Sequence, residues 1–202
     1  MKWLYLIADF SCGEKTIEAV IEAGIDYIQL REKEISSLEY LKRARRLREL
    51  TAGTKTKLII NDRLDIALLS DADGVHLGQS DIPVKEARTC LGPGKIIGAT
   101  AKTVEQARRA VDEGADYLGS GAWFPTETKK DAVPISQEVY KAIIKEVPIP
   151  NVAVGGINAE NGRIPLLCGA HGLASSAGIL KAQDPVGEVR KMRRLLEEFV
   201  TV

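Results

Sequence analysis

The chain has 202 residues, of which 45% are hydrophobic, and its 28 basic and 28 acidic side chains give a formal net charge of zero. This length and apolar content suit one domain with a sizeable core. The lack of a basic excess argues against general binding to nucleic acid or to a membrane surface, and we expect neither as a partner. An anionic ligand would have to be held by a local cluster of cations.

The start of the chain and its cysteines indicate where the protein works. Asp9 interrupts the first apolar run, which has the pattern of a strand and not of a signal peptide. No run approaches the ~20 apolar residues of a membrane span. Cys12, Cys90 and Cys168 are far apart and form no CxxC pair. This pattern favours a soluble protein of the reducing cytoplasm with structural cysteines.

Eight short apolar runs follow one another along the chain. They lie at residues 3–9, 27–31, 57–62, 74–78, 96–100, 117–121, 151–156 and 172–177. The runs are rich in Ile, Val, Leu and Tyr, a composition typical of strands that are buried on both faces. We therefore predict eight strands.

Longer amphipathic stretches separate these runs and predict helices. Residues 14–24 carry apolar side chains at helical spacing and stop at a glycine. Residues 36–53 begin with a serine cap, and their apolar stripe is formed by Leu38, Leu41, Ala44, Leu47 and Leu50. Residues 103–114 have Thr103 as cap, and residues 184–200 close the chain. Residues 158–169 form only a weak helical pattern.

Four segments repeat one form, in which a helix end and a small-residue break lead into a strand. They are residues 22–30, 69–77, 112–120 and 167–175. Short connections of this kind are typical of parallel α/β architectures. Eight strands with intervening helices predict a single-domain (β/α)₈ barrel over residues 1–202, smaller than the typical ~250 residues. An open, doubly wound sheet is the alternative.

Polar side chains gather where the predicted strands end. They are Gln29, Arg31, Glu32 and Lys33 after the second strand, Asn61, Asp62 and Arg63 after the third, His76, Gln79 and Asp81 after the fourth, and Thr100 at the fifth. The amino ends carry mainly Gly, Ala and Pro. Because the active sites of such barrels lie at the carboxyl ends of the strands, this asymmetry predicts a functional site there.

Asp62 and Asp81 predict a metal site. They follow neighbouring strands, and two unpaired carboxylates at one rim repel each other unless a hard cation lies between them. Mg²⁺ suits this arrangement, because it takes one or two carboxylates and completes its shell with water and phosphate oxygens. Two structural alternatives stay open: Asp62 as a helix N-cap, and an ion pair of one carboxylate with Arg63.

Cations near this pair predict an anion site. Alternation along the second strand places Gln29 and Arg31 on one side, together with Lys33 if the chain stays extended. The segment 119–134 (GSGAWFPTETKKDAVP) adds four polar side chains where the sixth strand ends: Thr126, Thr128, Lys129 and Lys130. We interpret this segment as a loop that closes over an anion; the alternative is a solvated turn.

The last two strands are followed by glycine-containing loops, Gly155–Gly156 and residues 175–178 (SSAG). Glycine lets the backbone approach an anion closely, so these loops predict a monophosphate site. Together with the carboxylate pair and the cations, they predict an enzyme that handles a diphosphate and a monophosphate. His76 is more typical of a hydrogen-bonded core histidine than of a catalyst.

Five segments resemble the thiamine phosphate synthases. They are QLREK (29–33), INDRLDIALLSDADGVHLGQSDIP (60–83), GPGKIIGATAKT (92–103), GADYLGSGAWFPTETKKDA (114–132) and VAVGGI (152–157), and the resemblance runs from about Tyr5 to the end of the barrel. The family is a single-domain (β/α)₈ barrel. It joins hydroxymethylpyrimidine diphosphate to hydroxyethylthiazole phosphate, gives thiamine phosphate and diphosphate, and requires Mg²⁺.

The resemblance implies a role for each candidate residue. Asp62 and Asp81 would hold Mg²⁺, and Gln29 and Thr100 would line the pyrimidine pocket. The implied diphosphate contacts are Arg31, Lys33, Asn61, Thr126, Thr128 and Lys129, of which Arg31, Lys33 and Lys129 would assist catalysis. The implied contacts of the thiazole phosphate are Gly156 and the backbone near Ser176 and Ala177. In the family the pyrimidine–diphosphate bond breaks first, and the thiazole nitrogen attacks the resulting cation.

The chain departs from the family pattern at several positions. Thr100 replaces a serine, His171 replaces an aspartate, and Ala177 replaces a serine near the last strand. These changes bear on the thiazole half of the site more than on the diphosphate half. Gly121-Ala122 also stands where the family has Gly-Pro.

Two other functions compete with this one. A thiazole tautomerase shares the barrel and uses a histidine in place of the metal site, but the QLREK segment and the carboxylate pair argue against it. A non-catalytic, phosphate-binding regulatory barrel is favoured only by the altered last strand. The sequence leaves the oligomeric state open, and a homo-oligomer is compatible with it.

Overall fold

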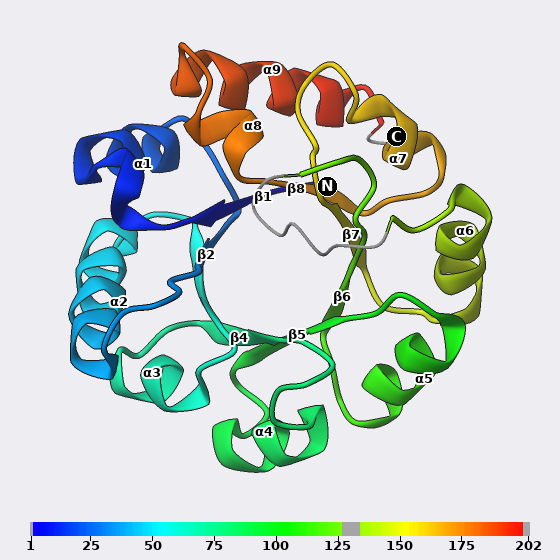
Figure 1. Cartoon of the computed structure of the whole chain (residues 1–202), viewed down its shortest axis with the longest axis horizontal. Helices are drawn as coiled ribbons and strands as arrows, with labels where there is room; N and C mark the ends of the chain where they lie inside the picture. The colour runs from blue at the N-terminus through cyan, green and yellow to red at the C-terminus, as the bar shows by residue number, and fades with distance from the viewer. Residues whose placement is uncertain (1, 127–133, 200–202) are drawn as a thin grey trace.

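Eight parallel strands close into one barrel in this computed structural model, which describes residues 2–126 and 134–199 (Figure 1). The strands are β1 (Trp3–Ala8), β2 (Tyr27–Leu30), β3 (Lys57–Asn61), β4 (Gly74–Leu77), β5 (Ile96–Thr100), β6 (Tyr117–Ser120), β7 (Asn151–Val154) and β8 (Gly172–Ser175). Each strand pairs with the next along the chain, and β8 pairs with β1. The predicted barrel is confirmed, and the open sheet is excluded.

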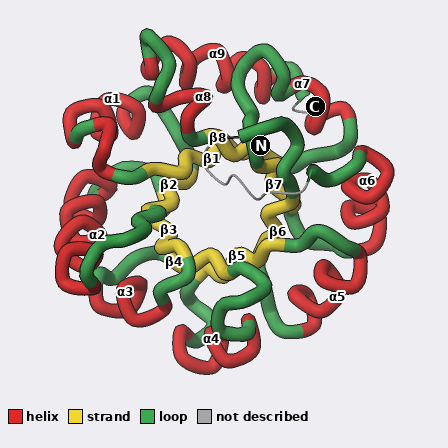
Figure 2. Tube along the Cα trace, in the orientation of Figure 1, coloured by secondary structure: helices red, strands yellow, loops and turns green. Residues whose placement is uncertain are grey.

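Helices form an outer ring around the strands (Figure 2). They are α1 (Glu14–Glu22), α2 (Ser37–Thr51), α3 (Leu64–Leu69), α4 (Val84–Leu91), α5 (Val104–Asp112), α6 (Gln137–Glu146), α7 (Arg163–Leu167), α8 (Ala177–Leu180) and α9 (Pro185–Glu197), with a 3₁₀ turn, η1 (Phe10–Cys12). Within the described ranges, none of these helices has both the length and the apolar composition needed to cross a membrane.

Side-chain caps begin two of the predicted helices. Ser36 Oγ accepts the N–H of Glu39 at 3.1 Å, and Thr103 Oγ1 accepts that of Gln106 at 3.2 Å. The predicted apolar stripe of α2 is wrong at Leu38, which is 65% exposed. The buried face of α2 includes a tyrosine in place of Leu38. Its buried residues are Tyr40, Ala44, Leu47 and Thr51.

Alternation along the strands divides the core into two layers. In β1, Leu4 and Leu6 pack outward against the helices, whereas Tyr5 faces the barrel interior. The buried members of the interior layer are Tyr5, Ile59, Tyr117, Val152 and Ala174. Because large side chains fill its amino-terminal part, the barrel is a packed core and not a pore, and a cavity lies toward the carboxyl ends.

The repeated segments of the sequence have a structural counterpart at the amino ends of the strands. Asp26, Asp73 and Asp116 directly precede β2, β4 and β6, and each accepts a backbone N–H of the preceding strand at 2.7 to 2.8 Å. Each carboxylate also pairs with an arginine of the helix layer; these are Arg193, Arg48 and Arg88. His171 occupies the corresponding position before β8.

Candidate active site

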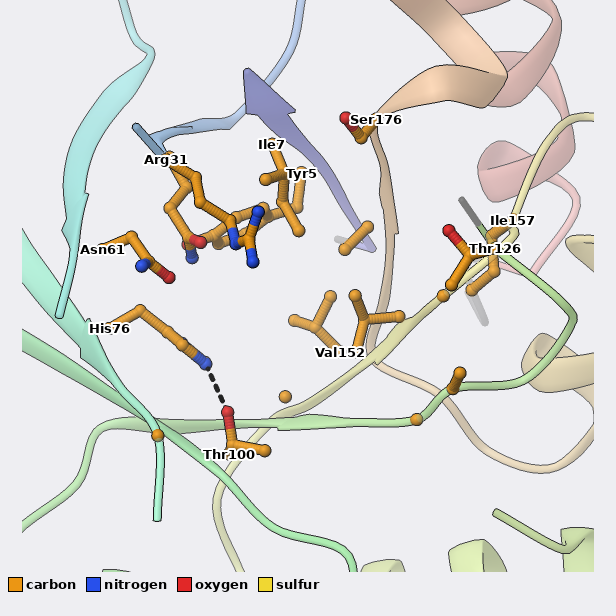
Figure 3. Close-up of a pocket in the computed structure, with 18 of the residues that line it drawn as sticks. Tyr5, Ile7, Arg31, Asn61, His76, Thr100, Thr126, Val152, Ile157 and Ser176 are labelled. Carbon is orange, nitrogen blue, oxygen red and sulfur yellow. Dashed lines mark hydrogen bonds between the residues drawn. The ribbon is translucent and has the colours of Figure 1, made fainter. Parts of the chain in front are cut away.

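A cavity of about 740 Å³ lies at the carboxyl ends of the strands, and each of the eight strands contributes to its lining. Figure 3 shows Arg31, Asn61 and His76 extending into it opposite Ile157 and Thr126. The cavity brings together every described candidate residue: Gln29, Arg31, Lys33, Asn61, Asp62, Asp81, Thr100, Thr126, Gly156, Ser176 and Ala177. Thr128, Lys129 and Lys130 lie outside the described residues.

Asp62 and Asp81 line one side of this cavity, where each carboxyl group shifts the pKa of the other. Asp62 has a left-handed backbone (φ 63°), an uncommon conformation for a non-glycine residue. Its N–H donates to the carbonyl of His76 at 2.9 Å, which holds it against β4. Asp81 turns back on its own loop and accepts the N–H of Gly78 at 2.6 Å.

Neither structural alternative for the carboxylates holds. The residue at the cap of α3 is Arg63, and no side chain caps that helix. The guanidinium of Arg63 binds Asp65 instead, with its Nε 2.9 Å from Oδ1. Asp62 and Asp81 are therefore left to face each other and the cavity.

The two carboxyl groups have opposite pKa shifts. Burial alone would raise the pKa of Asp62, but its hydrogen bonds with the Lys33 ammonium and with Asp81 outweigh burial and hold this pKa below the usual value. Burial and the neighbouring Asp62 carboxylate raise the pKa of Asp81. A proton is thus held most readily on Asp81, as expected for two acids that share one site.

Two cations differ in their surroundings. Lys33 Nζ lies 2.8 Å from Asp62 Oδ2, so that lysine is tied to the carboxylate pair. Arg31 lines the cavity and makes no ion pair with any residue in 2–126 or 134–199.

Lys102 also lines the cavity, and the sequence analysis missed it. Its position two residues beyond β5 was the available signal.

Tyr40 of α2 holds the ends of β2 and β3 in place. Its buried hydroxyl lies 2.8 Å from the carbonyl oxygen of Leu30 and 3.1 Å from that of Asn61. These carbonyls directly precede Arg31 and Asp62, so the tyrosine anchors the backbone of a cation and of a carboxylate. Glu32 points outward and binds Arg43 at 2.8 Å, which is a structural role.

Glycines shape the opposite side of the cavity. Gly156 has φ 67°, and a Cβ there would lie 2.6 Å from the carbonyl oxygen of Pro125. A Cβ on Gly178 would lie 2.6 Å from Ser175 Oγ and would also overlap the Ile157 carbonyl. Backbone segments after β7 and β8 therefore approach one another and the cavity in a way that larger residues would prevent.

His76 lies deep in the cavity wall with a ring nitrogen near each of two hydroxyl groups. Nδ1 is 3.0 Å from Tyr117 Oη, and Nε2 is 3.1 Å from Thr100 Oγ1. Figure 3 draws the second of these hydrogen bonds as a dashed line. Burial lowers the pKa of His76 to about 4 and raises the pKa of Tyr5 and of Tyr117, so all three side chains are neutral near pH 7. The expected hydrogen-bonded histidine is confirmed, but Tyr5 and Tyr117 were missed as site residues.

A closed (β/α)₈ barrel with carboxylates, cations and glycine loops around one cavity defines a barrel enzyme of the phosphate-handling class. The family model described as thiamine monophosphate synthase matches residues 4–179. The chain belongs to this family.

Relatives named as thiamine-phosphate synthases are similar in sequence to nearly the whole of this chain. A thiamine-phosphate synthase of Clostridioides difficile is 47% identical over 193 residues, which are 93% of this chain and 92% of the relative. One of Methanobrevibacter smithii is 44% identical, over 90% of this chain and 89% of the relative. The solved structure of a thiamine phosphate pyrophosphorylase from Pyrococcus furiosus superimposes with a TM-score of 0.90 at 37% identity, and covers 98% of this chain and 97% of that one.

Proposed function

We propose that this protein is a thiamine-phosphate synthase, which joins hydroxymethylpyrimidine diphosphate to hydroxyethylthiazole phosphate and releases diphosphate. One observation carries the proposal: a single cavity holds cations beside a carboxylate pair on one side and glycine loops on the other. These are the two arrangements that a diphosphate and a monophosphate require.

The carboxylate pair fits Mg²⁺. Asp62 and Asp81 offer oxygen ligands at one point of the rim, and in the described part of the chain no group of three or more His, Cys, Asp or Glu residues is arranged for a metal. Two carboxylates are what Mg²⁺ commonly takes from a protein. When bound, the ion supplies positive charge against the departing diphosphate. Asp62 and Asp81 are the residues that would hold it.

Charge stabilisation is the main task of the remaining residues. We assign Arg31, Lys33 and Asn61 to the diphosphate, with Thr126 at the mouth of the cavity. Thr128 and Lys129 are assigned to the same group by sequence. As the bond between the pyrimidine methylene and the diphosphate oxygen breaks, its electron pair leaves with the diphosphate, and these groups offset the developing charge.

The organic parts are placed by the rest of the lining. Gln29 and Thr100 are assigned to the pyrimidine ring. Gly156 and the backbone at Ser176 and Ala177 are assigned to the thiazole phosphate. Holding the thiazole in line lets its nitrogen lone pair form the new bond to the pyrimidine methylene, which requires positioning and no general base. The three cysteines are free thiols, which supports our placement of the enzyme in the reducing cytoplasm.

The test is an assay of the full chain with both substrates and Mg²⁺, in which thiamine phosphate is identified as the product. Asp62→Ala should abolish turnover and leave the fold intact, and undiminished activity would remove the metal assignment. Conversion of a thiazole phosphate tautomer without the pyrimidine substrate would identify a tautomerase. Binding of both substrates without product would identify a regulatory barrel.

A further inference from the structure

A chain of hydrogen bonds crosses the floor of the cavity between the two side chains assigned to the pyrimidine. Gln29 Nε2 donates to Tyr5 Oη at 2.8 Å, and the hydroxyls of Tyr5 and Tyr117 are 2.8 Å apart. The chain continues from Tyr117 to His76 Nδ1 at 3.0 Å and from His76 Nε2 to Thr100 Oγ1 at 3.1 Å. Gln29, Tyr5 and Tyr117 are each at most 4% exposed.

With Gln29 Nε2 facing Tyr5, as in the structure, only one set of directions gives every proton of this chain an acceptor. The amide nitrogen of Gln29 can only donate, and each neutral hydroxyl has a single proton. Tyr5 therefore donates to Tyr117, and Tyr117 donates to Nδ1 of His76. The proton of His76 is then on Nε2, which donates to Thr100. While Gln29 Nε2 faces Tyr5, reversing any later step leaves a buried hydroxyl proton without an acceptor, which is unfavourable.

The barrel leaves space for this chain at two interior glycines. A Cβ on Gly98 of β5 would lie 2.5 Å from His76 Nδ1 and would overlap the Tyr117 ring. A Cβ on Gly119 of β6 would lie 2.9 Å from His76 Cε1. Any larger residue at these inward positions would displace the histidine or the tyrosine, so the placement of both rings depends on glycine.

We propose that Tyr5, Tyr117 and His76 are positioning residues that determine which pyrimidine the enzyme accepts. The hydrogen-bond chain holds the carboxamide of Gln29 in one orientation, with Oε1 as an acceptor and one N–H as a donor. At the other end it leaves the proton of Thr100 for the ligand. This inference rests on the proposed function, because it takes the pyrimidine to lie between these two residues.

The resulting pattern selects an aminopyrimidine over its oxo analogue. An exocyclic amino group beside a ring nitrogen offers a donor next to an acceptor, which matches the oriented carboxamide. In the 4-oxo analogue the carbonyl accepts and the ring N–H donates, so both contacts become repulsive. Sites built around such contacts reject mismatched analogues strongly, because buried polar groups are left unpaired. If Gln29 could turn over freely, it would accept either ring.

The direction of the chain can be tested without substrate. The protein has two histidines, so His171→Asn leaves His76 as the only imidazole. The ¹⁵N chemical shifts of its ring nitrogens should show the proton on Nε2. In Tyr117→Phe, which removes the donor to Nδ1, the tautomer should no longer be fixed. A proton on Nδ1 in the otherwise unchanged protein would mean that the chain runs the other way and would overturn the proposal.

The consequence for specificity is tested by comparing kcat/KM for the 4-amino and 4-oxo pyrimidine diphosphates, or Kd if no turnover occurs. In Tyr117→Phe the preference for the amino substrate should fall roughly tenfold or more. Dividing the amino-to-oxo ratio of kcat/KM in the unchanged protein by the same ratio in Tyr117→Phe removes the intrinsic difference in reactivity between the substrates. Tyr27→Phe is the matched control, because Tyr27 stacks on Tyr5 at 5.5 Å but has no bond in the chain.

Unchanged selectivity in Tyr117→Phe would refute the positioning role. Equal losses in Tyr117→Phe and Tyr27→Phe would also refute it, because packing alone would then explain them. A protein that makes no thiamine phosphate but shows the Nε2 proton would contradict the proposed function and leave the hydrogen-bond chain intact. The two failures are therefore distinguishable.

Discussion

The ammonium nitrogen of Lys33 lies 2.8 Å from a carboxylate oxygen of Asp62, so a cation that follows β2 and an acid that follows β3 are joined across the rim of the barrel. This pair places positive charge directly beside the proposed metal ligands. The pKa of the same carboxyl group is also affected by Asp81, which lies in the loop after β4. Three neighbouring strand ends thus form one electrostatic unit, and its members can be tested separately.

Lys33→Ala should weaken binding of the pyrimidine diphosphate and leave stability nearly unchanged. We expect KM to rise by roughly tenfold or more, because a charge-assisted contact is lost, whereas an exposed ion pair contributes only about 0–1 kcal/mol to folding. Lys57→Ala is the control, since both lysines are 53% exposed and each pairs with one aspartate. Equal KM values in the two variants would remove Lys33 from the site.

Asp81→Asn should lower turnover by roughly 100-fold and raise the Mg²⁺ concentration needed for half-maximal rate. An asparagine at this position still accepts the N–H of Gly78 and no longer repels Asp62, so the fold should be retained. Asp65→Asn is the control, because Asp65 binds Arg63 outside the cavity. A normal Mg²⁺ dependence in Asp81→Asn would contradict the metal assignment.

Gly178→Ala should damage the thiazole phosphate side of the cavity. The added methyl group would meet Ser175 Oγ and the Ile157 carbonyl, so the loops must move apart, at about 1–3 kcal/mol of stability. We expect a larger rise in KM for the thiazole phosphate than for the pyrimidine diphosphate. Gly94→Ala, with open space around its Cβ position, should leave both values unchanged. A rise confined to the pyrimidine substrate would refute this placement.

Stability should fall as the pH decreases from about 6.5 to about 4. Burial lowers the pKa of His76 to about 4, so within this window the unfolded chain binds a proton that the folded protein excludes. Neutral His76 makes its full contribution to the free energy of unfolding when the pH is above the pKa of histidine in the unfolded chain. This contribution, at most about 3 kcal/mol, is lost as the pH falls toward the pKa of His76 in the folded protein. Denaturant unfolding across the window measures the slope.

His171 contributes to the same slope with the same sign, because burial and the positive charge of Lys2 lower its pKa. The pH dependence of unfolding is therefore measured in His171→Asn, with and without His76→Asn. Removal of His76 should make the free energy of unfolding depend less on pH between about 6.5 and about 4. An unchanged slope would show that carboxyl groups alone account for the acid sensitivity.

His171→Asp should stabilise the barrel. Asp26, Asp73 and Asp116 each accept the N–H of the residue opposite them on the preceding strand. The residue opposite position 171 is Asn151, so its N–H would be the donor to an aspartate there. The nearby Lys2 charge would favour an acid. After loss of the edge contact between His171 and Trp3, we expect a net gain of about 1 kcal/mol, or roughly 2–4 °C in Tm. His171→Leu should show no gain, and an equal Tm for both variants would refute the explanation.

Much of the fold follows from local patterns. All eight strands begin where the apolar runs begin, and they end within two residues of the predicted ends. Ser36 and Thr103 mark helix starts because a cap needs only its own backbone neighbours. Leu38 was misplaced because helical spacing alone does not show which of two adjacent stripes faces a sheet.

By itself the sequence determined the barrel, the carboxyl-end location of the candidate site, and the gathering of acids and cations at neighbouring strand ends, because these depend on residue order and on the two-residue period of a strand. Only the tertiary structure decided that Asp62 faces Asp81 and not Arg63, and that Tyr5, Tyr117 and His76 connect Gln29 with Thr100. These contacts join strands that are distant along the chain. They depend on the register and closure of the whole ring, and on the space left by Gly98 and Gly119.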